Sequence, residues 1–509
     1  MILDTLTVGF SHFLSLYNIG AAFIGCLLGI IFGALPAFTA SMGVATLLPF
    51  AYGLPVDTSL VLLSSIYVGA MYGGSIPAIL MHTPGTPGAA ATVIDGYAMA
   101  KKGQADTAIV VSAASSAVAS FVGGVFICIT GPLLSFYAAR ISPAEIFLVA
   151  LLGIIVLGGL AGKDPIKGFL GGIIGLLMGT VGADFQVGHD RFSFGIYQLF
   201  EGIPLVPALV GLLALSECLV MVQKETSELV AVSQVKFSLK KILRDTWDTI
   251  FGKYWKVTYL STFIGGVIGI IPGEGAAVAN FVAYDQAKRH SRHPELFGTG
   301  IPEGVIACEA ANNSVVPLAL LPALALGVPG SSTAALILAG VMMQGLRPGP
   351  GVFERSPEVM GTFLVGLLVA SWLQLLIGLI IVGPAVKLCQ IKNSILAGII
   401  LVLAVIGVFA VHNSFFDVGV MLACALLGYG LKVWGCPPVT AVVGLVLGPI
   451  AEKSFTTALS ISGGSAGIFF FRPLAAILWG IILLSLLLPW WKKRKRKGKI
   501  SKPPDEKMG

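Results

Sequence analysis

Residues 263–275 read FIGGVIGIIPGEG, an apolar run broken near its end by a Pro-Gly pair. Basic residues flank the segment on both sides, at Lys256 and Lys288. The part before the break, Val257–Ile271, would form a helix of about 22 Å, too short to cross a hydrocarbon core of about 30 Å. We therefore predict a re-entrant hairpin that returns over Ala276–Ala287, with its tip near mid-bilayer. A single long kinked helix is the alternative, and the matching basic flanks argue against it.

The same pattern occurs in the first half of the chain. Phe23–Thr39 reads FIGCLLGIIFGALPAFT, and Thr83–Thr92 (TPGTPGAAAT) resembles Val328–Leu336 (VPGSSTAAL). Counted between their prolines, the first pair of motifs is 236 positions apart and the second pair 245. Chance similarity between apolar segments is the alternative, but two matched motifs in register favour a duplication. Repeats that carry paired, Gly/Pro-interrupted segments are typical of secondary transporters.

The amino-acid composition indicates that lipid surrounds most of the protein surface. Hydrophobic residues make up 56% of the 509 residues and charged residues only 11%, against about 25% charged in soluble domains. We predict an all-α polytopic membrane protein of two homologous halves, with about 10–14 transmembrane segments, some of them broken or re-entrant. Clear apolar stretches are Ala108–Thr130, Ile146–Ala161, Gly361–Val382, Ile395–Val411 and Leu474–Leu488.

The distribution of charge predicts orientation and domain boundaries. The basic tail Lys492–Lys499 directly follows the Trp490–Trp491 pair, and the polar interval Gln223–Lys256 holds seven Lys/Arg against four Asp/Glu. Positive charge beside a membrane exit marks the cytoplasmic side, and this position argues against a nucleic-acid patch. The predicted divisions are a first membrane repeat (1–222), a cytoplasmic linker (223–256), a second membrane repeat (257–491) and a cytoplasmic tail (492–509). We identify no cleavable signal at the N-terminus.

Four helix breaks together predict an anion site. They lie at residues 35–41, 83–88, 271–275 and 328–333, and each places small or hydroxyl residues where a half-helix begins. Ser and Thr are good N-caps, so Thr39, Thr86, Ser331 and Ser332 are expected at these helix starts. A helix N-terminus has unpaired N–H groups and a partial positive charge, so several that converge could bind an anion without an arginine. The substrate-binding candidates are the hydroxyl residues of the breaks, with neighbouring small and amide residues: Thr39, Ser41, Ser75, Thr83, Gly85, Thr86, Gly273, Asn312, Asn313, Gly330, Ser331 and Ser332.

Polar residues between the breaks predict a cation site. Glu309 and Asn313 are four residues apart and share one face of a helix, where burial without a partner would be costly. Asn280, Asn312 and Asn313 offer carbonyl oxygens to a cation and N–H groups to a carboxylate. Glu274 is a candidate cation ligand or proton site. The alternatives are interhelical hydrogen bonds for the amides and a helix cap for Glu274. For His82, a hydrogen bond to a tip carbonyl and a contact with substrate are both open, whereas Asp95, before Gly96, is expected only to cap a turn.

At these motifs the chain resembles the large membrane subunit of the tripartite tricarboxylate transporters. The blocks YGGSIPAIL, TPGTP, EAANN and VPGS are distinctive, and the resemblance covers nearly the whole chain. The matching segments are Gly33–Pro49, Tyr67–Gly103, Ile270–Ala283, Glu303–Asn313 and Leu326–Pro350.

The resemblance implies uptake of citrate-like organic carboxylates across a bacterial inner membrane, with a periplasmic solute-binding protein and a small membrane subunit. It implies symport with a cation, Na⁺ or H⁺, and an elevator-like arrangement of inverted repeats. Two departures from the family pattern are Ala37, where Gly is usual, and His82, where Asn is common; we expect the first to tighten one tip and the second to shift substrate preference. The family's motif positions fall on Pro36, Thr39, Ser75, Pro84, Gly85, Thr86, Pro272, Gly273, Asn312, Asn313, Pro329, Gly330 and Ser331.

Two other function classes are a membrane enzyme and a passive channel. A membrane enzyme would need an acid/base or metal constellation, and the sequence contains no HExxH motif. The seven cysteines show no metal-ligand spacing, so no transition-metal site is predicted. No organic cofactor is predicted either. A passive anion channel is the remaining alternative, although duplicated broken helices suit alternating access better.

Overall fold

The structure is a computed structural model that describes residues 2–35, 38–138, 141–160, 165–184, 188–223, 238–271 and 275–483. It confirms the predicted all-α polytopic membrane fold. Nine helices of the described part are long and apolar enough to span a membrane, and five shorter apolar helices accompany them. The only strands among these residues are β1 (Gly182–Ala183) and β2 (Asp190–Arg191), which pair antiparallel.

The helices run in the following order: α1 (Ile2–Phe13), α2 (Leu16–Ala34), α3 (Ala40–Tyr52), α4 (Val56–Gly73), α5 (Ser75–Leu80), η1 (Pro87–Ala89), α6 (Thr92–Lys101), α7 (Ala105–Ala138), α8 (Pro143–Leu160), α9 (Pro165–Gly179), η2 (Tyr197–Leu199), α10 (Leu205–Leu209), η3 (Val210–Leu215), α11 (Ser216–Gln223), α12 (Leu239–Ile250), α13 (Trp255–Ile270), α14 (Gly275–His290), η4 (Pro294–Leu296), α15 (Pro302–Leu326), α16 (Ser332–Met343), α17 (Val352–Arg355), α18 (Pro357–Leu388), α19 (Asn393–His412), α20 (Phe415–Val433), α21 (Pro438–Ile461) and η5 (Ala466–Phe469). A last helix covers Pro473–Leu483.

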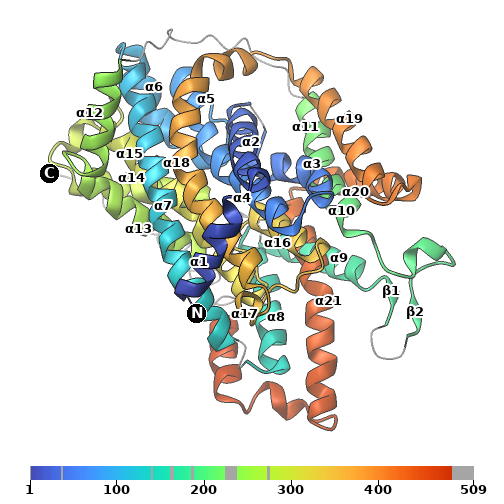
Figure 1. Cartoon of the computed structure of the whole chain (residues 1–509). Coiled ribbons are helices and arrows are strands. Elements are labelled where there is room, and N and C mark those ends of the chain that lie inside the picture. The colour runs from blue at the N-terminus through green and yellow to red at the C-terminus, as the bar shows by residue number, and fades with distance from the viewer. Residues whose placement is uncertain are drawn as a thin grey trace, which may run out of the picture.

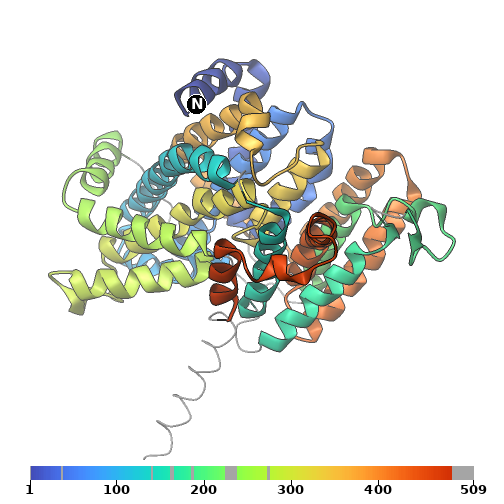
Figure 2. The same ribbon diagram turned by 90° about the horizontal axis from the view of Figure 1, so that it is seen from below.

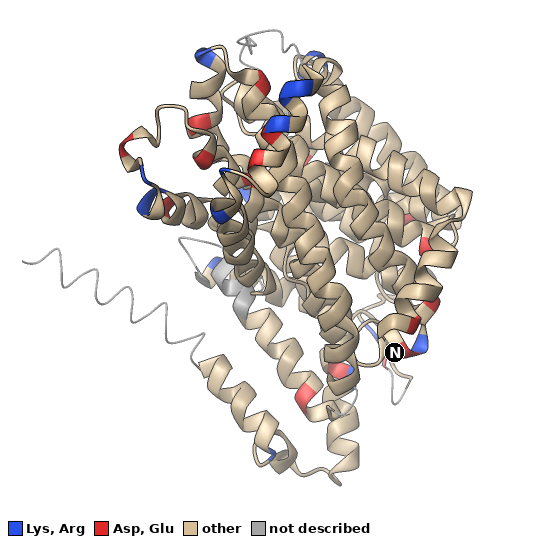
Figure 3. Cartoon of the chain, turned by 60° about the vertical axis from the view of Figure 1, so that its left-hand side comes forward, with Lys and Arg blue, Asp and Glu red and all other residues tan. Residues whose placement is uncertain are grey.

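The bundle has two flanks. In Figures 1 and 2, α12–α14 lie on one side, and α19 and α20 lie on the other, beside the β1–β2 hairpin. Figure 3 shows charged residues gathered toward the ends of the bundle, with long helices between them that carry almost none. This distribution fits a bilayer as solvent, because charges in the hydrocarbon region are costly.

Glycine explains how closely the central helices approach. Gly25, Gly29 and Gly33 follow one face of α2, and a Cβ on any of them would overlap the backbone carbonyl of a residue in α4. The second half repeats the arrangement, because Gly265 and Gly269 of α13 lie directly against α15. Small residues at such interfaces let helix backbones pack closely in lipid, where no hydrophobic force drives association.

The two halves interlock rather than form separate lobes. The long helix α7 of the first half packs along α15 of the second, and α18 packs against both α2 and α4. The exchange is reciprocal: η3 of the first half packs on α20 of the second, and α21 of the second packs on α9 of the first. Reciprocal contacts of this kind are what a two-fold relation between repeats produces.

A third matched segment strengthens the duplication. Residues 202–213 (GIPLVPALVGLL) and 435–446 (GCPPVTAVVGLV) align without gaps at a separation of 233 positions. Gly202 and Gly435, which open the two segments, both have positive φ, 93° and 77°. The equivalent glycines Gly211 and Gly444 press against backbone carbonyls of α20 and α9, respectively. This segment fixes the register between the two repeats.

The four predicted breaks are interruptions of helix in the structure. α2 ends at Ala34 and α3 begins at Ala40, and α15 ends at Leu326 before α16 begins at Ser332. The predicted hairpin is formed by α13 and α14, which pack against each other with bounds within three residues of those expected. The tip residues Pro36, Ala37, Pro272, Gly273 and Glu274 lie outside the described residues, as do 224–237 of the linker and the tail from 484.

Candidate functional site

All four breaks line one cavity of about 430 Å³. The first residue of each following helix faces it: Ala40 of α3, Pro87 of η1, Gly275 of α14 and Ser332 of α16. Three of these four elements are α-helices of at least 12 residues. Their unpaired N–H groups therefore give the cavity wall a partial positive charge supplied by both halves of the chain.

Thr39 and Ser41 form the tip between α2 and α3. The Thr39 hydroxyl accepts a hydrogen bond from the Met42 N–H at 3.2 Å and thereby caps α3. Its oxygen also lies 2.9 Å from Ser41 Oγ, and both residues line the cavity. The predicted N-cap is confirmed at this position, because an extended Thr with a free hydroxyl satisfies an otherwise unpaired helix N–H.

Ser331 and Ser332 form the tip before α16. Ser331 Oγ accepts from the Ala334 N–H at 3.1 Å and caps the helix. The same oxygen lies 3.0 Å from the hydroxyl of Tyr67, on α4 of the other half. Tyr67 lines the cavity but was not among the predicted residues. Only the fold brings it there, because 264 positions separate it from Ser331.

Thr86 differs from the expected capping residue. It occupies the N-cap position directly before η1, but its hydroxyl makes no capping hydrogen bond. Thr86 is buried, lines the cavity, and its Oγ1 has no hydrogen-bond partner among the described residues. The capping prediction is wrong here because η1 is a single short turn. A hydroxyl that is not used by a helix is available to a ligand.

The other substrate candidates lie behind the wall. Ser75 donates to the Tyr72 carbonyl, and Thr83 to the Met81 carbonyl. Gly85 and Gly330 are buried, each with its N–H bonded to a carbonyl of a neighbouring segment. These four residues shape the breaks but do not line the cavity.

Asn280 and Asn312 meet at Gly88, which lines the cavity. Asn280 Nδ2 donates to the Gly88 carbonyl, and Asn312 Oδ1 occupies the space where a Gly88 side chain would lie. Asn312 Nδ2 donates to the Met71 carbonyl at 3.1 Å. Both amides are fully buried, yet the side-chain oxygen of each has no partner among the described residues. Buried oxygens of this kind suit a hard cation, which prefers amide and carboxylate oxygens.

Asn313 belongs to a second buried cluster, around Glu309. Asn313 Nδ2 donates to Ser116 Oγ at 2.8 Å, and Ser116 in turn donates to Glu309 Oε2 at 3.3 Å. Thr92 donates to Glu309 Oε1 at 2.5 Å. Glu309 is fully buried, and no ion pair to a Lys or Arg is formed by it in the described part of the chain. Asn313 Oδ1 is also without a partner there.

An ion pair in the cavity wall was missed by the sequence analysis. Lys432, in the last turn of α20, pairs with Glu217 of α11, and both residues line the cavity. They are the only charged side chains in the described part of the lining. None of the four breaks contains Lys or Arg, so the break motifs alone do not predict a basic side chain at the cavity. No local motif marks Lys432, because α20 carries none of the four breaks.

His82 and Asp95 take structural positions. His82 is exposed and does not line the cavity, and its ring lies tilted against that of Tyr97, with the ring centroids 4.5 Å apart. Asp95 is fully buried, and its Oδ1 accepts from the N–H groups of Gly298, Gly300 and Ile301. Asp95 therefore organises the loop that leads into α15.

Comparisons with known proteins place this geometry in context. The family model of the tripartite tricarboxylate transporter TctA family matches residues 19–443. An uncharacterized 52.8 kDa protein from the TAR-I ttuC' 3' region of Agrobacterium vitis is 35% identical over 490 residues, which cover 96% of each chain. An uncharacterized protein from the TAR-II ttuC' 3' region of the same organism is 34% identical over 224 residues, or 44% of this chain and 93% of that protein.

Proposed function

The chain belongs to the tripartite tricarboxylate transporter TctA family, and from this premise we propose that it imports small organic carboxylates by cation symport. As a family member it is a multi-pass membrane subunit of a transporter. The finer steps proposed here are binding of a di- or tricarboxylate in the cavity at the breaks, coupling to Na⁺ or H⁺, and delivery by a periplasmic binding protein.

The observation that carries the proposal is the meeting of helix starts from both halves at one cavity. α3 comes from the first half, and α14 and α16 come from the second. Such helix starts bind anions through backbone N–H groups, and the hydroxyls of Ser41, Thr86 and Ser332 can donate further hydrogen bonds. A site shared between repeats also suits alternating access, in which one half moves against the other.

The buried oxygens behind the tips support the coupling step. Asn280, Asn312 and Asn313 present amide oxygens without partners, and Glu309 is a buried carboxylate with hydroxyl donors but no basic partner among the described residues. Burial of an unpaired charge is costly. A sodium ion or proton that neutralises Glu309 would remove this cost, so cation and anion binding would stabilise each other. Glu274 remains a proposed ligand outside the described residues.

The proposal includes two protein partners and an orientation. The name of the family implies a three-part system, so we assign this chain a periplasmic binding protein and a small membrane subunit in a bacterial inner membrane. The exposed basic residues of α12 and the basic tail would face the cytoplasm.

Uptake into proteoliposomes tests the function directly. The purified full-length chain, with its small subunit and binding protein, is supplied with radiolabelled citrate or succinate under an imposed sodium or proton gradient. Gradient-driven accumulation supports symport. Exchange that is accelerated by internal substrate distinguishes a carrier from a channel, and uptake that neither gradient stimulates would overturn the proposal.

A further inference from the structure

The ion pair between Glu217 and Lys432 is placed to take part in substrate binding. The Lys432 side chain is 21% exposed and that of Glu217 is 29% exposed, so the pair faces the open cavity and is not enclosed by packing. It lies in the same lining as the starts of α3, α14 and α16. The cavity thus combines the partial positive charges of several helix starts with the full positive charge of Lys432, which is paired with the Glu217 carboxylate.

A substrate with two or more carboxylates needs more than helix starts. Helix N-termini carry about half a unit of charge each, and this charge acts mainly within the first turn. One carboxylate group at the tips would leave the second without a basic side chain unless Lys432 supplies it, because Lys432 is the only Lys or Arg in the described part of the lining. Charge-assisted hydrogen bonds between ammonium and carboxylate groups are about twice as strong as neutral ones.

We propose that Lys432 receives the second carboxylate of the substrate and that Glu217 occupies this lysine when the cavity is empty. The inference rests on the proposed function and adds specificity-determining residues to it. Because Glu217 carries the same functional group as the substrate, the exchange replaces one charge-assisted hydrogen bond at Lys432 by another. The released Glu217 stays at the cavity wall, where water can solvate it.

The internal repeat supplies a matched control for this pair. A second cavity, of about 540 Å³, is lined by Gly202, Ile203, Leu445 and Val446. Their repeat equivalents Gly435, Cys436, Leu212 and Leu213 line the first cavity. This second cavity is bounded by an ion pair between Arg191 of β2 and Glu452 of α21.

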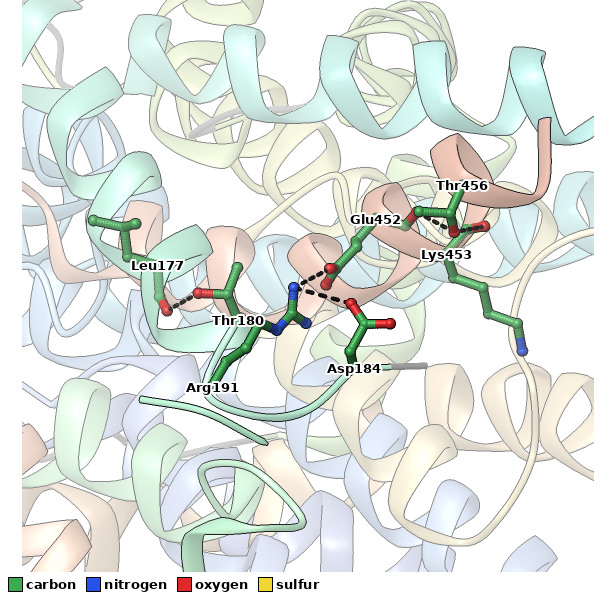
Figure 4. Close-up of polar contacts among 7 residues, drawn as sticks. All are labelled: Leu177, Thr180, Asp184, Arg191, Glu452, Lys453 and Thr456. Atoms are coloured by element: carbon green, nitrogen blue, oxygen red, sulfur yellow. Dashed lines mark hydrogen bonds and ion pairs between the residues drawn. The ribbon is translucent and has the colours of Figure 1, made fainter. Parts of the chain in front are cut away.

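This second pair resembles the first in chemistry but not in surroundings. Figure 4 shows Arg191 directed between Glu452 and Asp184, with N···O distances of 2.5 and 3.4 Å. The hydrogen bond to Glu452 raises the pKa of Arg191 above its ordinary value. Like Glu217–Lys432, the pair joins the first half to the second, but no described residue of the four breaks lines its cavity. Breaking it tests the general effect of losing an ion pair between the halves.

Binding to the purified full-length chain tests the inference, with citrate, succinate and propionate as probes that carry three, two and one carboxylates. Dissociation constants are measured by titration in detergent with sodium present. K432Q should raise the dissociation constants of citrate and succinate by about tenfold or more. It should raise the dissociation constant of propionate by less than about twofold. E217Q should lower the dissociation constants of citrate and succinate, because the Glu217 carboxylate no longer competes with the substrate for Lys432. E452Q should leave all three constants within about twofold of wild type.

The outcomes separate this inference from the proposed function. If wild type binds none of the probes, the proposed function fails, and the inference fails with it. Two results would overturn the role of Lys432 while the proposed function stands. In the first, K432Q binds citrate as well as wild type does; in the second, K432Q weakens the binding of all three probes by the same factor. Should K432Q fail to fold, E217Q decides alone: tighter citrate binding supports the exchange, and unchanged or weaker binding contradicts it.

Discussion

The hydroxyl of Tyr67 lies 3.0 Å from Ser331 Oγ and joins the two halves of the chain at the cavity wall. Ser331 at the same time caps α16 by accepting the Ala334 N–H. One oxygen therefore stabilises a helix start, links the repeats and faces the proposed substrate.

Replacement of Ser331 by alanine should impair transport more than folding. S331A removes the cap, at a cost of about 1 kcal/mol, together with the bond to Tyr67. We expect citrate uptake to fall by about tenfold or more, with an unchanged amount of protein in the membrane. The matched control is S414A, because Ser414 caps α20 in the same way, by accepting the Asp417 N–H, and lies outside the cavity. Equal uptake by S331A and wild type would count against the site.

Replacement of the buried oxygens should change the response to the cation. N313A and E309Q each remove an oxygen ligand or a charge from the buried cluster. We expect both to abolish uptake or to raise the sodium concentration for half-maximal uptake by about tenfold. Gln374 of α18 serves as control, since it is also a fully buried amide without a partner in the described part of the chain, yet it makes no hydrogen bond to the Glu309 cluster. A sodium dependence unchanged in N313A and E309Q would argue against this cluster as the coupling site.

The glycine contacts between α2 and α4 predict a sharp positional difference. A Cβ at Gly29 would overlap the carbonyl of Ile66, whereas nothing lies within 4 Å of a Cβ at Gly20 on the same helix. G29A should destabilise the protein by about 1–3 kcal/mol, seen as a melting temperature lowered by several degrees. G20A should leave the melting temperature unchanged or raise it slightly, because alanine favours helix. Similar melting temperatures for the two variants would contradict the close packing.

Orientation can be measured with two engineered cysteines. Lys240 is exposed on α12, and Lys493 belongs to the basic tail outside the described residues. In K240C and K493C, we expect labelling only by reagents that reach the cytoplasmic face. Labelling of either position by an impermeant reagent added to intact cells would overturn the proposed topology.

Local signals explain why so much of the tip geometry can be predicted from sequence. Proline and glycine end helices through their own backbone chemistry, and hydroxyl residues at the next helix start are efficient caps. The caps at Thr39 and Ser331 follow from these rules. Recurrence of the motifs at one period then predicts that the breaks belong to equivalent halves.

Contacts between distant segments explain what the sequence did not reveal. Lys432 and Glu217 meet only because α20 packs against the helix formed by α10, η3 and α11, and no spacing rule relates them. Thr86 was assigned a capping role from its position, but η1 is too short to need one. In the same way, the orphan oxygens of Asn280 and Asn312 depend on how α14 and α15 surround Gly88.

The most direct test of the account is substrate protection at both halves of the cavity. Ser41 and Ser332 line the cavity from different halves and are partly exposed. S41C and S332C are labelled with a small thiol reagent in a background with C436A, since Cys436 is a native cysteine of the lining. We predict that citrate slows labelling at both positions with the same half-maximal concentration, and leaves K240C unaffected. Protection at neither position, or at one of them alone, would contradict a single carboxylate site formed by both halves.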